Sequence, residues 1–121
     1  MIRTLAVIMG LLFIAGGVLG FIPQFAPGGM LLDLFRVNAI HNLIHICTGI
    51  IALWVGFTSN SASKIFFQIF GILYALVTIV GIMHGDAPIF GLIANNKAGN
   101  WLHAIIAVLF LYFGFGLKAK K

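Results

Sequence analysis

The chain has 121 residues, of which 62% are apolar and only 7% are charged. Soluble domains carry about 25% charged residues. This chain therefore cannot cover a water-exposed surface with polar groups, and we expect the bilayer to be its solvent. The net charge is +5, but the basic residues form no stripe or face, so we expect no nucleic-acid partner.

Four uncharged apolar runs are each long enough to cross a hydrocarbon core of about 30 Å, which takes roughly 20 helical residues. They cover residues 4–22, 38–57, 65–83 and 101–117. The connections are one short polar hairpin and two longer loops with proline and glycine, at residues 58–64, 23–37 and 84–100. The sequence thus predicts a single all-α integral membrane domain over residues 1–121, folded as a four-transmembrane-helix bundle.

Lysine and arginine are distributed unequally between the two ends of these helices. One end would carry five basic residues, namely Arg3, Lys64, Lys118, Lys120 and Lys121. The other end would carry Arg36 and Lys97, together with both aspartates. Because positive residues are enriched in cytoplasmic loops, we expect both termini in the cytoplasm. The location would be a bacterial inner (cytoplasmic) membrane, with the longer loops outside.

The two halves of the chain resemble each other. The first apolar run aligns with the third, and the second aligns with the fourth. The matched residues are Gly10 and Gly71, Gly20 and Gly81, Asn42 and Asn100, His45 and His103, and Leu53 and Leu111. Since each half would hold two spans, both halves would cross the membrane in the same direction. We therefore expect two parallel helical-hairpin repeats.

The polar side chains of the spans gather at the predicted outer face. His41 and His45 are four residues apart and share one helix face. His45 lies roughly 10 Å along the helix from its start, at a depth where an imidazole needs a polar partner. We expect His45 to approach its counterpart across the pseudo-axis. The candidate cluster consists of His41, Asn42, His45, His84, Asn100 and His103.

Three interpretations of this cluster remain open. Histidine and asparagine can form hydrogen bonds between helices and so fix their register. Alternatively, the histidines bind zinc or copper, or ligate one haem b, with candidate metal ligands His41, His45, His84, His103 and Asp86. The third interpretation is a site for a quinone or another small molecule, or a proton relay.

A catalytic triad is not expected, because the serines of residues 58–64 lie on the opposite side of the membrane from every histidine. We do not interpret the chain as an enzyme. Our working interpretation is a small scaffold or accessory protein with a His/Asn cluster at its outer face, and the alternative is a metal- or haem-binding protein with a redox role. Its partners would be the bilayer and a second copy or a larger membrane complex.

Three motifs carry a resemblance to a known family. They are GFIP at residues 20–23, HNLIH at residues 41–45 and GNWLH at residues 99–103. With them the chain resembles an uncharacterised family of bacterial four-transmembrane-helix proteins, catalogued as a domain of unknown function. That family has H-N-x-x-H opening its second span and D-N-x-L-H opening its fourth, where this chain has Gly99 in place of the aspartate. The resemblance covers nearly the whole chain and implies a four-span inner-membrane protein without an established activity.

Overall fold

The computed structural model describes residues 1–117. Lys118, Lys120 and Lys121, on which the expected orientation partly depends, lie outside the described residues. The described chain forms four long helices, the last of which continues into a π-helical turn, η2. Their bounds are α1 (Ile2–Leu19), α2 (Ala39–Thr58), α3 (Asn60–His84), α4 (Lys97–Leu111) and η2 (Tyr112–Gly116). The predicted all-α four-helix bundle is confirmed.

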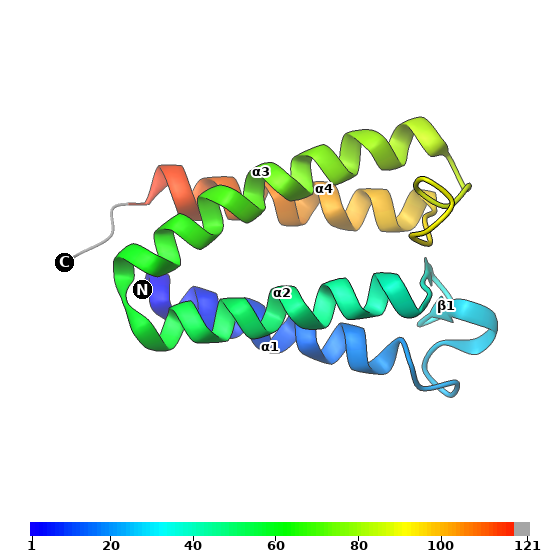
Figure 1. Cartoon of the computed structure of the whole chain (residues 1–121), viewed down its shortest axis with the longest axis horizontal. Coiled ribbons are helices and arrows are strands. Elements are labelled where there is room, and N and C mark those ends of the chain that lie inside the picture. The colour runs from blue at the N-terminus through cyan, green and yellow to red at the C-terminus, as the bar shows by residue number, and fades with distance from the viewer. Residues whose placement is uncertain (118–121) are drawn as a thin grey trace.

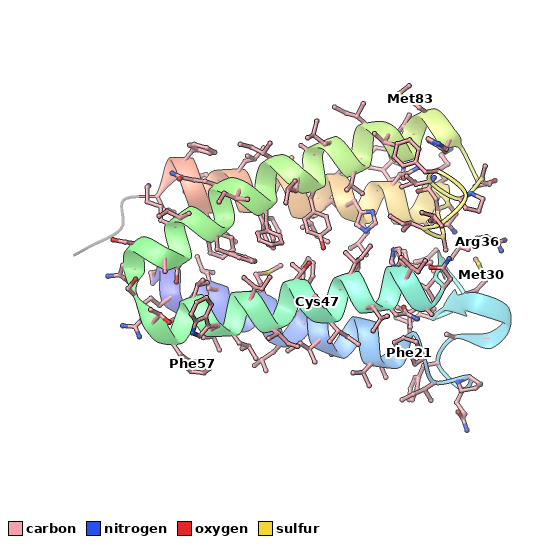
Figure 2. All side chains as sticks on the ribbon, in the orientation of Figure 1. Phe21, Met30, Arg36, Cys47, Phe57 and Met83 are labelled. Atoms are coloured by element: carbon pink, nitrogen blue, oxygen red, sulfur yellow. The ribbon has the colours of Figure 1, made fainter. Side chains whose placement is uncertain are left out.

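The outward surfaces of the helices are apolar. All four helices are long and apolar enough to span a membrane. Large apolar side chains project away from the bundle on every helix, as Phe57 and Met83 do in Figure 2, where they are 69% and 78% exposed. A soluble monomer does not expose apolar surface on this scale. The chain is therefore a multi-pass integral membrane protein whose outer surface contacts lipid.

The structure corrects the predicted connection at residues 58–64. Ser59 alone separates α2 from α3, so the predicted loop is wrong in length. The Ser59 hydroxyl accepts a hydrogen bond from the Ala62 backbone N–H at 3.0 Å, as a helix N-cap does. Ser63 is buried and donates to the Val55 carbonyl at 3.1 Å. The polar residues of this segment therefore start a helix instead of forming a loop.

The helices pack as two pairs, α1 with α2 and α3 with α4. Figure 1 shows the α2–α3 turn beside the N-terminus, and α2 and α3 diverging from this end toward the other. We call the end with the N-terminus and the α2–α3 turn the turn end. The opposite end, which holds the two longer connections, is the loop end (Figure 1).

The connection between α1 and α2 is folded at the loop end. It contains a 3₁₀ turn, η1 (Pro27–Gly29), and an antiparallel hairpin of β1 (Met30–Leu31) with β2 (Phe35–Arg36). The connection between α3 and α4 closes with a single antiparallel bridge between Ile89 and Ile93. Each of the two longer connections therefore contains a short antiparallel pairing of its own.

Two asparagines at the loop end join the halves of the molecule. The side-chain oxygen of Asn38 caps α2, and that of Asn96 caps α4. The Asn38 amide also donates to the Leu92 carbonyl at 3.0 Å, and the Asn96 amide donates to the Leu34 carbonyl at 3.0 Å. The cap of α2 thus bonds to the connection before α4, and the cap of α4 bonds to the connection before α2.

The centre of the bundle is aromatic. Phe67 of α3 and Phe110 of α4 are fully buried, with their ring centroids 5.1 Å apart. Phe13 of α1 lies 5.7 Å from Phe110 on one side and 5.2 Å from His45 on the other. The histidines therefore sit directly against this aromatic core, on its loop-end side.

Glycine allows α1 and α2 to cross at backbone contact. A Cβ atom built at Gly49 would lie 2.6 Å from the Gly10 carbonyl oxygen, and one built at Gly10 would lie 2.8 Å from the Gly49 oxygen. The same close approach occurs between α3 and α4, where a Cβ at Gly71 would meet the Leu111 backbone at 3.0 Å. Small residues at such crossings are typical of membrane helices, since packing rather than the hydrophobic effect holds the helices together.

Candidate functional site

Three histidines converge between α2 and α4. His41 and His45 come from α2 and His103 comes from α4, and their ligand nitrogens all lie within 4.8 Å of one another. The ring centroid of His41 lies 4.5 Å from that of His45 and 5.6 Å from that of His103. The Nε2 atoms of His45 and His103 are 3.3 Å apart. The predicted approach of His45 to His103 is confirmed.

The asparagines of the two N-x-x-H motifs have a different position. A Cβ at Gly20 of the α1 terminus would overlap the Asn42 carboxamide, and a Cβ at Gly81 of α3 would overlap the Asn100 carboxamide. Each asparagine thus packs against the glycine of the neighbouring helix. The histidine three residues later then points toward the other histidine-bearing helix, so that His45 and His103 meet, and the asparagine packing fixes the rotation of the helix that carries it.

The cluster is not satisfied by its own hydrogen bonds. His41 and His103 are buried, and their Nδ1 atoms have no hydrogen-bond partner within residues 1–117. A buried polar atom left unpaired costs about 1–3 kcal/mol. The 3.3 Å between His45 and His103 is longer than the usual range of about 2.7–3.2 Å for an N–H donor. The three imidazoles are therefore placed for a partner other than one another.

The structure does not bring His84 and Asp86 to this cluster. The Nδ1–H of His84 donates to the Val80 carbonyl at 2.8 Å, and its Nε2 accepts from the Phe90 backbone N–H at 3.4 Å. His84 thus closes the C-terminal end of α3 against the loop. Asp86 is exposed in that loop, where it lines a separate pocket beside Lys97.

Sequence reasoning missed two hydroxyl groups beside the histidines. The Tyr74 ring centroid lies 5.6 Å from that of His103, and its hydroxyl lies 3.0 Å from Thr48 Oγ1. The alignment of the two halves contained a signal for Tyr74, because it places this tyrosine opposite Phe13, which contacts His45. Because Phe13 lies beside His45, its counterpart Tyr74 was a candidate for a position beside His103.

Two cavities flank the cluster. The larger, of about 210 Å³, is lined by all three histidines. The smaller, of about 190 Å³, lies toward the β1–β2 hairpin and is lined by His41 and His45 but not by His103. The larger cavity is therefore the space that all three imidazoles face together.

The geometry suits a metal ion. Two nitrogens bound to one tetrahedral ion at about 2.0–2.1 Å lie roughly 3.3–3.4 Å apart, which is the separation between His45 and His103 Nε2. His41, one helical turn from His45, supplies a third imidazole. Three histidines that leave a fourth position free are a known arrangement of metal ligands.

Residues 3–116 match the family described as Domain of unknown function (DUF4383). The chain belongs to this family. The match covers all four helices of this DUF4383 chain and confirms the resemblance to a family of unknown function. The comparisons with curated proteins and with solved structures gave no match. The family supplies no activity, so function has to be argued from the histidine site.

Proposed function

We propose that the chain is a metal-binding membrane protein in which His41, His45 and His103 hold one copper ion. The convergence of two buried imidazoles and one half-buried imidazole, with all ligand nitrogens within 4.8 Å, supports this proposal most strongly. A bound ion would also join the Nε2 atoms of His45 and His103, whose 3.3 Å separation is long for a direct hydrogen bond. The site lies within the membrane-spanning helices, against the aromatic core.

Charge favours Cu⁺ over divalent ions. Imidazole ligands suit zinc, copper, iron and nickel. No carboxylate or thiolate belongs to the cluster within the described part of the chain, so the ion's charge would stay uncompensated at membrane depth. The cost of burying an ion rises with the square of its charge. A monovalent ion is therefore the one that three neutral histidines hold most readily.

The haem interpretation and the scaffold interpretation account for fewer features of the three histidines. A haem iron would need His45 and His103 on opposite faces of a flat macrocycle. The 3.3 Å between their nitrogens and the His41 ring beside both leave no space for one. In a scaffold or accessory protein the cluster would only join α2 to α4. That role is supported by the hydrogen bond between His45 and His103 but gives no role to the His41 imidazole that lies beside both rings.

The proposal is tested by anaerobic titration of the detergent-purified protein with Cu⁺ against a competing chelator. One copper per chain is expected, and X-ray absorption should show nitrogen ligands at about 2.0 Å. Acidification should release the ion, since each ligating nitrogen must be deprotonated. A protein that takes up no copper, or copper bound through sulfur of methionine or Cys47, would contradict the proposed site.

We also propose that the chain is a duplicated helical hairpin. Equivalent contacts in the two halves support this. A Cβ at Gly10 would meet Leu53, and a Cβ at Gly71 would meet Leu111. The caps Asn38 and Asn96 make reciprocal bonds across the bundle, and the β1–β2 hairpin has its counterpart in the bridge of the second loop. The pair His45 and His103 would then lie on the pseudo-axis.

We further propose that the loop end faces the outside of a bacterial inner membrane and that both termini are cytoplasmic. Arg3 and Lys64 lie at the turn end, where they donate to the carbonyls of Gly56 and Leu117. In the sequence, three further lysines follow Leu117. The positive-inside rule supports this orientation, and the histidine site would then be nearer the outer surface.

Cysteine labelling in a Cys47→Ser background tests the orientation. Leu92→Cys places a thiol on the second loop, where Leu92 is 60% exposed. Asn95 would be a poor choice, because it is buried and donates to Gly81 and Gly85. We expect an impermeant maleimide to label Leu92→Cys in intact cells and to label Ser61→Cys, at the turn end, only after lysis. The reverse pattern would invert the topology.

A further inference from the structure

A copper ion held by three histidines keeps a coordination position free. We propose that this position binds a small uncharged molecule that reaches it from the lipid bilayer, between α2 and α3. The inference rests on the proposed copper site. It adds the class of ligand and the route by which the ligand enters.

The free position faces the larger cavity. Of the two cavities that flank the cluster, only the one of about 210 Å³ is lined by all three histidines. An ion bound to three ligands directs its remaining position away from them, toward the space that they share. The molecule that completes the coordination therefore has to fit in this cavity.

The lining of the cavity excludes charge. Apart from the histidines, its lining consists of apolar side chains and two hydroxyl groups, from Ile44, Thr48, Phe70, Leu73, Tyr74, Val77 and Ile93. A cation would be repelled by the bound ion, and an anion, although the ion would attract it, would have to leave its hydration and pass apolar side chains to arrive, at a cost of several kcal/mol. An uncharged molecule has no such penalty.

The two hydroxyl groups are already occupied as donors. Thr48 Oγ1 donates to the Ile44 carbonyl at 2.8 Å, so Tyr74 is the donor in its 3.0 Å bond with Thr48. No hydroxyl proton is then left to stabilise an anion. With a volume of about 210 Å³, against the ~30 Å³ that one water occupies in the liquid, the cavity holds a small molecule, of about seven heavy atoms.

A groove leads from this cavity toward lipid. The groove, of about 350 Å³, shares Ile44, Thr48 and Phe70 with the cavity. Its other lining residues lie on α2 and are Ile40, Leu43, Cys47 and Ile51, which are exposed on the apolar surface or border it. Figure 1 shows α2 diverging from α3 toward the loop end. Small apolar molecules partition into a bilayer, so this face is the side from which they arrive.

Carbon monoxide is a suitable probe, because it is small and uncharged and its stretching vibration reports binding to Cu⁺. The Cu⁺-loaded protein is exposed to carbon monoxide under anaerobic conditions and examined by infrared spectroscopy. We expect one copper carbonyl per bound copper. Azide, a small anion, should not displace it.

Filling the cavity should remove the carbonyl and keep the copper. In Val77→Phe a larger side chain occupies the cavity lined by the three histidines, and we expect unchanged copper stoichiometry and loss of the carbonyl band. Ile44→Phe, at the junction with the groove, serves as a second variant if Val77→Phe does not fold. The matched control is Gly16→Leu, which fills the other cavity and should leave the band unchanged.

The outcomes separate the two proposals. A protein that binds one Cu⁺ but forms no carbonyl overturns the inferred ligand and leaves the copper site standing. A carbonyl that persists in both cavity-filling variants, or that azide displaces, overturns the route and the class of ligand. A protein that binds no copper overturns both the site and the ligand.

Discussion

Replacing His103 with alanine is expected to abolish copper binding. His103 is the ligand that α4 contributes to the cluster, whereas the other two ligands lie one turn apart on α2. Removing the partners that merely orient a metal's ligands lowers affinity by about 10–100-fold, so removal of a ligand itself should exceed that loss. Anaerobic titration of the purified variant with Cu⁺ measures the change.

His84→Ala is the matched control for this prediction. It also removes one imidazole from the loop end. However, His84 is bonded to Val80 and Phe90 and is not part of the cluster. Copper stoichiometry should therefore stay at the wild-type value. Equal copper binding by His103→Ala and the wild type would place the metal elsewhere. A copper-free wild type that loses thermal stability in His103→Ala would support the scaffold interpretation, with a loss of about 0.6–2 kcal/mol.

Gly49→Leu is expected to separate α1 from α2. A Cβ at Gly49 would lie 2.6 Å from the Gly10 oxygen and 2.9 Å from the Ile14 nitrogen, and these backbone atoms cannot rotate away as a side chain can. Overpacking of a core costs about 1–3 kcal/mol, and contact with backbone on two turns of α1 puts this variant at or above the upper end. Thermal unfolding in detergent, followed by circular dichroism, measures the loss.

Gly16→Leu controls for the loss of a helical glycine. No atom lies within 4 Å of a Cβ at Gly16, so the larger side chain has space, and a stability change within about 0.5 kcal/mol is expected. Equal unfolding temperatures for Gly49→Leu and Gly16→Leu would show that the glycine crossing does not hold the α1–α2 pair together.

The sequence by itself determined the four helices and one contact of the site. Apolar runs of spanning length predict membrane helices because every backbone polar group in lipid has to be bonded within its own segment. The pairing of His45 with His103 was predicted from the alignment of the two halves, since equivalent residues of two parallel repeats would meet across their axis. The place of His41 followed from the helical period, four residues before His45.

Only the tertiary structure decided which other groups belong to the site. The sequence offered His84 and Asp86 as ligands and did not select Tyr74 or Thr48. A helix that is apolar on every side gives little periodic signal for which face turns inward, so the rotation that brings Tyr74 beside His103 could not be read from residue spacing. Likewise, His84 ends α3 and bonds there to Val80 of the same helix and to Phe90 of the following loop. The cavity that all three histidines line is shaped by side chains of α2 and α3 together with Ile93 and His103, and only their packing in three dimensions brings these residues together.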